Sequence, residues 1–487
     1  MIYYKKDTLL FFAGSLGITF IPQPTQAIQN KTKPNILVII TDQQQAAMMS
    51  CAGNKYVKTP NLDKLASQGI RFERAYAANP VSIPSRFSLM TGRYPSEINM
   101  EDNEHQKNSV PKEMLENALG SVFTKAGYET AYAGKMHLTG SDFENGLENP
   151  LAYGFQKYLT LNDPEGREKT VAACINYIKA SKEKPFLLYA SLINPHDICY
   201  MPLMDWTAAE KKKNPYANSK VNQFIQEILK QPDGMSKQDF IDKFCPPLPD
   251  NFEIPLHELP SYTTIKANNY IGWSRKNYTE SDWRIYRYLY ARLTEYVDAQ
   301  IGEILNGLKE AGLEDNTLVV FTSDHGDQNA AHKTGLKGFL YEESINIPFI
   351  LKWKNVIPEN QIDNSHLISN GLDLLPTLCD FAGIQSNQNF SGLSVRPLAL
   401  SSKMNKWRSH LLVENNSARL IIFDKTWKYS VDILKMDLDN SENKEKHEML
   451  FNLSTDKGEK NNLVLKEKYN HKLERGRKIL SKEYNIN

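Results

Sequence analysis

Cysteine is scarce in this chain of 487 residues, which contains five. The cysteines are odd in number, widely scattered and without the spacing of a zinc site, which excludes a disulfide-rich scaffold and a cysteine-ligated metal; they are Cys51, Cys174, Cys199, Cys245 and Cys379. We expect mostly buried thiols, with room for one disulfide.

An excess of charge of one sign is also lacking. The chain has 58 Lys and Arg against 57 Asp and Glu, for a formal net charge of +1. Such a balance produces no global field that would attract nucleic acid or an anionic membrane, so neither is expected as a partner. Any anionic ligand must be held by cations placed locally around its site.

Long apolar runs are missing as well. An apolar stretch from about Leu9 to Ile21 follows Lys5 and Lys6, but it is shorter than the ~20 residues of a membrane span, and no later stretch approaches that length. The pattern predicts a signal peptide over residues 1–27, cleaved after Ala27, and a mature chain without a membrane span. We therefore expect export to the periplasm or the exterior.

Three apolar segments end in acids or histidines. Residues 35–40 run into Asp42, residues 185–191 into His196, and residues 316–322 into Asp324 and His325. Buried parallel strands have such continuous apolar runs, and ligands bind at their carboxyl ends. Helical patterns at 61–68, 112–126 and 283–311 alternate with the strands, which predicts an α/β fold: a mostly parallel sheet with helices on both faces.

The distribution of residue types along the sequence predicts two domains after the signal peptide. Residues 28–405 form the large catalytic domain, with an insertion at about 201–270 near the ligand end of the sheet. Residues 406–487 combine short strand-like runs with a basic final helix. This pattern predicts a small C-terminal α+β domain with an antiparallel sheet.

The most informative segment begins at Ser82. Pro84 near a helix start places Ser82 at the helix N-terminus, where free amide groups favour an oxyanion, and Arg86 returns to the same face one turn later. This arrangement suits a nucleophile that attacks an anionic ester. A capped helix on a loop is an equally good interpretation of these residues alone.

The string Ser82-x-Pro84-Ser85-Arg86, followed by Thr91-Gly92-Arg93, resembles the modification signature of the type I sulfatases of the alkaline phosphatase superfamily. That resemblance implies an alkaline-phosphatase-like fold. Further segments follow in the family's order: Asn35 to Asp42, Thr59 to Asp63, Gly134 to His137, Asn194 to His196, Ser323 to Gly326, Lys337, Tyr341 to Ser344, and Asp373 to Thr377.

The resemblance implies that Ser82 is oxidised to formylglycine (3-oxoalanine). In the family, one hydroxyl of the hydrated aldehyde attacks sulfur and the other then expels sulfate, whereas an unmodified serine would remain as a sulfate ester. A serine in place of cysteine is similar to the bacterial members that are matured by radical enzymes working without oxygen. An anaerobic sulfatase-maturing enzyme is therefore an expected partner.

The resemblance also implies one bound calcium. Asp42, Asp324 and His325 match the family's metal ligands, and Gln43 departs from the second aspartate that many members have. Gln43 and the modified Ser82 would complete the shell, whose oxygen-rich ligands favour Ca²⁺ over zinc. Taken singly, Asp42 fits a strand-end cap, and Asp324 and His325 fit a turn.

Five further residues complete the expected site. Lys135 and His137 lie two apart, so in an extended segment both would point to one side. By resemblance, Lys135 bridges nucleophile and sulfate, His137 contacts the formylglycine hydroxyl, and Lys337 is the second sulfate-binding lysine. We expect His196 to protonate the departing sugar oxygen, with His332 as the weaker candidate for that acid.

His105 follows the first motif closely and is a candidate substrate-binding residue. The expected function is an exported bacterial sulfatase acting on sulfate esters of carbohydrates, of the glycosaminoglycan or mucin type. An N-sulfoglucosamine sulfohydrolase and a phosphodiesterase or phosphotransferase with unmodified serine are the alternatives. A catalytically silent binding protein for sulfated glycans is the rival from another class, and it would be expected to lose Arg86, Lys135, His137 or His196.

Overall fold

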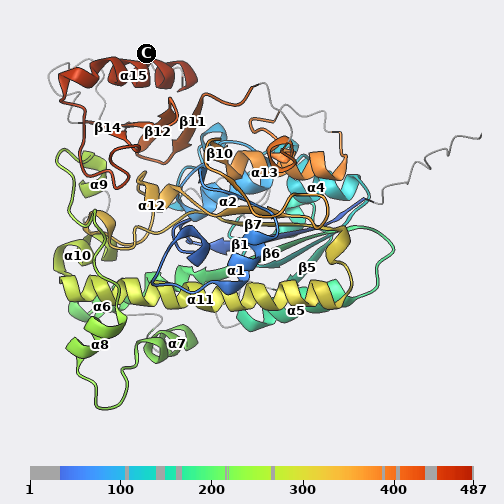
Figure 1. Ribbon diagram of the computed structural model, residues 1–487, viewed down its shortest axis with the longest axis horizontal. Coiled ribbons are helices and arrows are strands. Elements are labelled where there is room, and N and C mark those ends of the chain that lie inside the picture. Colours follow the sequence, from blue (N-terminus) through green and yellow to red (C-terminus); the bar gives the residue numbers. More distant parts are fainter. Residues whose placement is uncertain are drawn as a thin grey trace, which may run out of the picture. The chain divides into compact units, whose positions relative to one another are not determined.

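Figure 1 shows the computed structural model of the chain. It describes residues 33–104, 109–138, 149–160, 167–213, 217, 219–264, 269–385, 390–401, 406–433 and 447–484. The predicted signal peptide and His105 lie outside these ranges. From Pro34 onward the described residues form one compact unit. None of the helices in these ranges is both long and apolar enough to cross a membrane.

The described residues contain an eight-stranded sheet in the order β5-β4-β6-β1-β7-β8-β2-β9. Its central strand β1 pairs in parallel with β6 and β7, whereas β8 runs antiparallel to β7 and β2. The strands are β1 (Asn35–Asp42), β2 (Ile70–Phe72), β4 (Glu129–Gly134), β5 (Lys157–Thr160), β6 (Phe186–Pro195), β7 (Thr317–Ser323), β8 (Phe349–Lys352) and β9 (Gln361–Asp363). The predicted mostly parallel α/β sheet is confirmed.

Helices cover both faces of this sheet. All residues of β1 are buried, and because successive side chains of a strand point to opposite faces, Ile36 and Val38 pack on one side and Leu37 and Ile39 on the other. The first side is covered by α2 (Ser82–Thr91), α4 (Leu119–Lys125) and α13 (Asn370–Ala382), and the second by α1 (Pro60–Ser67), α5 (Arg167–Lys179) and α11 (Glu280–Glu310). This double burial explains the continuous apolar run of β1.

The prediction of a single helix over 112–126 is wrong. The segment forms α3 (Lys112–Glu116) and α4, and between them Ala118 takes an extended conformation with ψ 163°. The Asn117 side chain donates to the carbonyl of Glu113 at 3.0 Å, which is the local bonding by which asparagine competes with a helix.

The segment predicted as an insertion is largely helical. It contains α6 (Tyr200–Ala209), α7 (Lys220–Leu229), α8 (Lys237–Phe244) and α9 (Pro260–Thr264), followed by α10 (Tyr270–Asn277). Several of these helices gather at the N-terminal end of α11 (Figure 1). They share with it a cluster of buried side chains that includes Trp283 and Tyr286.

The C-terminal residues form a separate, four-stranded antiparallel sheet, as predicted. Its strands follow chain order: β11 (His410–Glu414), β12 (Ala418–Phe423), β13 (Trp427–Asp432) and β14 (Glu448–Asn452). The final helix α15 (Asn470–Tyr484) packs on one face through Leu473 and Leu480. The other face packs on Tyr76 and Tyr341, which precede the C-terminal sheet in the chain. Short elements complete the described fold: β3 (Ala75–Tyr76), β10 (Ile368–Ser369), α12 (Glu342–Ile345) and α14 (Arg396–Ala399). A domain boundary at residue 406 stays a prediction.

All five cysteines are free thiols, so the disulfide that the sequence left room for does not form. Four are buried, as expected, and Cys51 is partly exposed. Cys174 and Cys379, for example, belong to helices on opposite faces of the large sheet, which keeps their sulfur atoms apart.

Candidate active site

Several of the predicted site residues follow three neighbouring strands. Because β6, β1 and β7 are adjacent and parallel, their carboxyl ends meet at one edge of the sheet. Asp42 pairs with Pro195 in the register of β1 and β6, and Thr41 pairs with Ser323 in that of β1 and β7. Asp42, His196 and Asp324 therefore converge at this edge.

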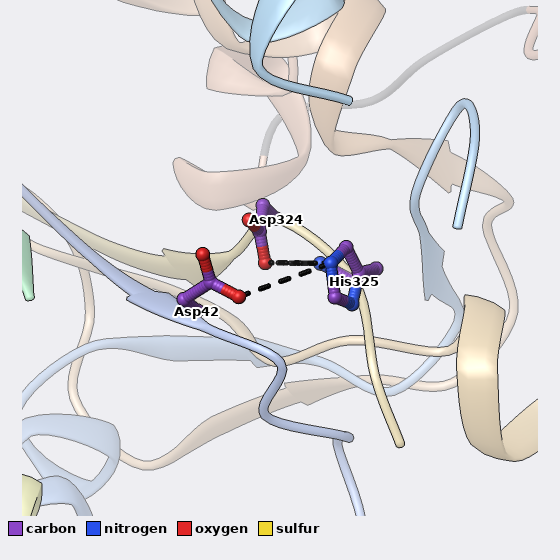
Figure 2. A group of neighbouring side chains, drawn as sticks. All are labelled: Asp42, Asp324 and His325. Carbon is purple, nitrogen blue, oxygen red and sulfur yellow. Dashed lines mark hydrogen bonds and ion pairs between the residues drawn. The ribbon is translucent and has the colours of Figure 1, made fainter. Parts of the chain in front are cut away.

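Asp42, Asp324 and His325 form the centre of the site. Figure 2 shows both carboxylates directed at the imidazole, and one potential ligand atom from each residue lies within 4.8 Å of the others. His325 Nε2 is 3.6 Å from Asp324 Oδ1 and 3.9 Å from Asp42 Oδ1. All three residues are fully buried.

The donor set fits a divalent cation. His325 Nδ1 donates to the carbonyl of Gly326 at 3.0 Å, so the lone pair of the neutral ring lies on Nε2, toward the carboxylates. In the described part of the chain, Asp42 Oδ1 accepts no hydrogen bond although it is buried. Two carboxylates and one imidazole supply hard oxygen ligands together with one nitrogen.

Two buried cations approach the same carboxylates. Arg86 lies 2.9 Å from Asp42 Oδ2 and 3.0 Å from Asp324 Oδ2, and Lys135 Nζ lies 2.6 Å from Asp42 Oδ2. Burial alone would raise the pKa of Asp42, but Lys135, Lys337 and Arg86 together hold that pKa well below its usual range. Burial and the nearby Asp42 raise the pKa of Asp324 to about 6.

Ser82 is the first residue of α2, as predicted, and it is fully buried. Its Oγ lies 3.0 Å from His325 Nε2 and accepts a hydrogen bond from Lys337 Nζ at 3.1 Å. Asn103 Oδ1 accepts from the backbone amide of Ile83 at 3.0 Å and so satisfies one free donor at the start of the helix. The structure thus brings Ser82, Lys337 and the cluster together.

The segment that carries Lys135 and His137 is not extended, so the same-side argument from spacing is wrong. β4 ends at Gly134 with φ 88°, and His137 has φ 54°. His137 nevertheless lies near the site: burial, followed by the charges of Lys135 and Arg86, lowers the pKa of its imidazole well below the usual range.

His196 directly follows β6, and the same nearby charges affect the pKa of its imidazole. Burial, then Lys135 and Lys337, lower the pKa of His196 well below its ordinary value, so the free imidazole is neutral. Next to it, Asp197 forms an ion pair with Arg167 at 2.5 Å.

The other two predicted residues have different surroundings. Gln43 Nε2 donates to Asp327 Oδ2 at 2.7 Å, and Gln43 Oε1 accepts from Cys199 Sγ at 3.3 Å. Its role as a metal ligand stays a prediction. His332 is fully buried and stacks on Tyr341 with the ring centroids 3.9 Å apart, and burial lowers its pKa to about 4.

Asp327 is a residue that the sequence did not single out. It is fully buried, burial raises its pKa to about 6, and it accepts hydrogen bonds from Gln43, Tyr286, Asn329 and Leu336. It lies three residues after Asp324 in the same motif, but the contacts that distinguish it come from distant parts of the chain.

A buried serine, two carboxylates, a histidine and three cations, gathered near the carboxyl ends of the central strands of an α/β sheet, are typical of a hydrolase of anionic esters. The sulfatase family model matches residues 34–384, and the model of the C-terminal region of N-sulphoglucosamine sulphohydrolase matches residues 332–484. The chain belongs to the sulfatase family and is a sulfuric ester hydrolase.

Individual relatives match over nearly the whole chain. A Delta 4,5-hexuronate-2-O-sulfatase of Bacteroides thetaiotaomicron is 28% identical over 93% of this chain and 89% of its own length. An arylsulfatase of Clostridium perfringens is 28% identical over 93% of this chain and 94% of its own. The solved structure of a 2-O GAG sulfatase is 26% identical, with a TM-score of 0.74 over 93% of this chain and 92% of that one.

Proposed function

We propose that this protein is an exported bacterial sulfatase that hydrolyses sulfate esters of carbohydrates, of the glycosaminoglycan or mucin type, with formylglycine at position 82 and one calcium ion. The observation that carries the proposal is the position of Ser82 Oγ, between His325 Nε2 at 3.0 Å and Lys337 Nζ at 3.1 Å at the start of α2. A nucleophile there would face both a metal site and a cation for the sulfate.

The relatives support a carbohydrate substrate. Besides the hexuronate-2-O-sulfatase, an N-acetylglucosamine-6-O-sulfatase of Bacteroides thetaiotaomicron is 26% identical over 81% of this chain. An N-sulfoglucosamine sulfohydrolase remains the second candidate because of the C-terminal family match.

Calcium would be held by Asp42, Asp324 and His325, with Gln43 and the modified residue 82 as the further ligands we propose. A bound divalent ion polarises a sulfate oxygen and orients the nucleophile. Two carboxylates in the donor set favour a hard cation. The ion would also offset the repulsion between Asp42 and Asp324, which contributes to the raised pKa of Asp324.

Oxidation of Ser82 by an anaerobic maturing enzyme would give an aldehyde, and addition of water to this aldehyde would supply one hydroxyl to attack sulfur and a second to release sulfate. Lys337 and Lys135 would neutralise the sulfate, and Arg86 fixes both carboxylates at the base of the site. We propose that His137 takes the hydroxyl proton during release.

His196 is the proposed acid that protonates the departing sugar oxygen. Its imidazole is neutral in the free protein because burial and two lysines lower its pKa. The negative charge of a bound sulfate offsets those lysines and raises the affinity of the ring for a proton. Substrate binding would therefore prepare the acid.

The proposal is tested by expressing the protein with and without an anaerobic maturing enzyme and assaying a panel of O-sulfated sugars, N-sulfated glucosamine and phosphate diesters. Activity on O-sulfated sugars that requires the maturing enzyme and is lost in Ser82→Ala supports it. Activity on phosphate diesters without maturation would contradict it, and preference for N-sulfated glucosamine would favour the second candidate.

A further inference from the structure

We propose that Asp327 is a positioning residue that fixes two parts of the site at once: the amide of Gln43, next to the metal ligand Asp42, and the loop that carries Lys337. This inference rests on the proposed calcium-dependent function. It adds a residue that touches neither sulfate nor metal and acts through its neighbours.

The first part is the contact with Gln43. Asp327 Oδ2 accepts from Gln43 Nε2 at 2.7 Å, which leaves Oε1 as the free end of that amide. Oε1 accepts only the weak donor Cys199 Sγ at 3.3 Å among its described contacts. A cation can displace such a donor easily, so Asp327 determines that Gln43 offers oxygen rather than nitrogen.

The second part is the loop from 328 to 338. Asp327 accepts from the amide of Asn329 at 2.7 Å and from that of Leu336 at 3.1 Å, so it holds both ends of the loop directly before Lys337. Several non-glycine residues of this loop have positive φ: Asn329, Ala330, His332, Lys333 and Leu336. Such conformations persist only where surrounding contacts impose them.

Tyr286 of α11 braces the same carboxylate. Its hydroxyl lies 2.8 Å from Asp327 Oδ2 and also accepts from the amide of Leu336 at 3.0 Å. Tyr286 therefore supports the loop but has no hydrogen bond to Gln43 in the described structure. The two halves of the proposal are thereby separable by mutation.

A carboxylate is needed at position 327 because all its partners donate. Four donors surround it, the residue is fully buried, and no ion pair to it occurs within the described ranges. Burial of a charge without an ion pair costs free energy, which the four donated hydrogen bonds offset here. An asparagine amide at this position would instead direct its NH₂ group at one of the donors. Asp327→Asn keeps the shape and removes this acceptor set.

The experiment compares Asp327→Asn, Tyr286→Phe and Asp298→Asn in the matured full-length protein. Asp298 is a matched control, because this buried carboxylate of α11 also accepts backbone amides, from Asn61 at 3.2 Å and Leu62 at 2.8 Å. Calcium affinity is measured by calorimetry well below the unfolding temperature, together with KM and kcat and with hydrogen exchange of the loop amides.

We expect Asp327→Asn to weaken calcium binding about 10- to 100-fold, the usual effect of losing a residue that orients a metal ligand. It should also raise KM and speed exchange at Asn329 and Leu336. Tyr286→Phe should raise KM and speed exchange with calcium affinity unchanged, and Asp298→Asn should alter neither property.

If folded Asp327→Asn binds calcium as tightly as the wild type, Asp327 does not orient Gln43 for the metal. If the amides of Asn329 and Leu336 in this variant exchange at the wild-type rate, Asp327 does not hold the loop. A wild-type protein that binds no calcium would instead contradict the proposed function. It would also contradict the role of Asp327 in orienting Gln43 as a calcium ligand. The two outcomes are distinguishable. The first is seen when a variant is compared with the wild type, whereas the second is seen in the wild-type protein alone.

Discussion

Ser82 Oγ and His325 Nε2 lie 3.0 Å apart, although the two residues are 243 positions apart in the sequence. Ser82 begins α2 and His325 follows the end of β7, so the contact joins the start of a helix to the edge of the central sheet. The hydroxyl of Ser82 donates to the lone pair of Nε2, because His325 Nδ1 donates to Gly326. The proposed nucleophile and the proposed metal site are therefore in direct contact.

Replacing the proposed acid should separate substrates by their leaving groups. We expect His196→Gln to lower kcat for a sugar sulfate by about 10²- to 10⁴-fold, because an alkoxide leaves poorly without a proton. Hydrolysis of 4-nitrophenyl sulfate should fall far less, since nitrophenolate needs no proton. Steady-state kinetics on both substrates checks this. Equal losses on the two would remove His196 from the role.

Removal of the metal should lower stability. Without a metal ion, Asp42 and Asp324 face each other, and among the described residues Arg86, Lys135 and Lys337 offset their charges. Calcium at 100 times its dissociation constant should add about 2.7 kcal/mol to the free energy of unfolding. Thermal unfolding in EDTA and in calcium measures this, and Asp42→Asn should abolish the difference. An unchanged unfolding temperature would argue against the site.

A hairpin of the C-terminal sheet should matter for sulfate binding. Asn415, in the turn between β11 and β12, donates to the carbonyl of Gly338 at 3.0 Å, directly after Lys337. We expect Asn415→Ala to raise KM several-fold and to cost about 1–2 kcal/mol of stability, because it also loses the turn bonds to Ser417 and Ala418. Ser417→Ala is the control, and its KM should stay at the wild-type value.

His332 should make the protein sensitive to acid. Burial lowers the pKa of His332 to about 4, against about 6.5 in the unfolded chain. Between these values the unfolded state binds more protons, so stability falls as the pH drops from about 6.5 to 4, by on the order of 2–3 kcal/mol. Urea unfolding of the wild type and of His332→Gln at several pH values checks this. The variant should lose less stability than the wild type over that interval.

The sequence predicted the parts of the fold that depend on periodicity and strand ends. Residues 35–40 are apolar on both faces because β1 is covered on both sides, and Asp42 and Asp324 could be placed together because parallel strands end at one edge. The sequence does not locate β14, because its five residues follow a charged stretch and have no strand pattern of their own.

The rest of the site depends on contacts that no local pattern encodes. The bonds from Asp327 to Gln43 and Tyr286 join three distant segments, and the left-handed conformation of His137 depends on its surroundings rather than on its spacing from Lys135. Such contacts depend on the packing of α11 against the sheet, which brings the three segments together.

The most direct test of the proposed function is the mass of the tryptic peptide that contains Ser82, residues 75–86, from protein made in a host with the anaerobic maturing enzyme. We expect a loss of two hydrogens, which marks oxidation of Ser82 to formylglycine. An unmodified serine in fully active protein would contradict it and would favour a phosphotransfer function.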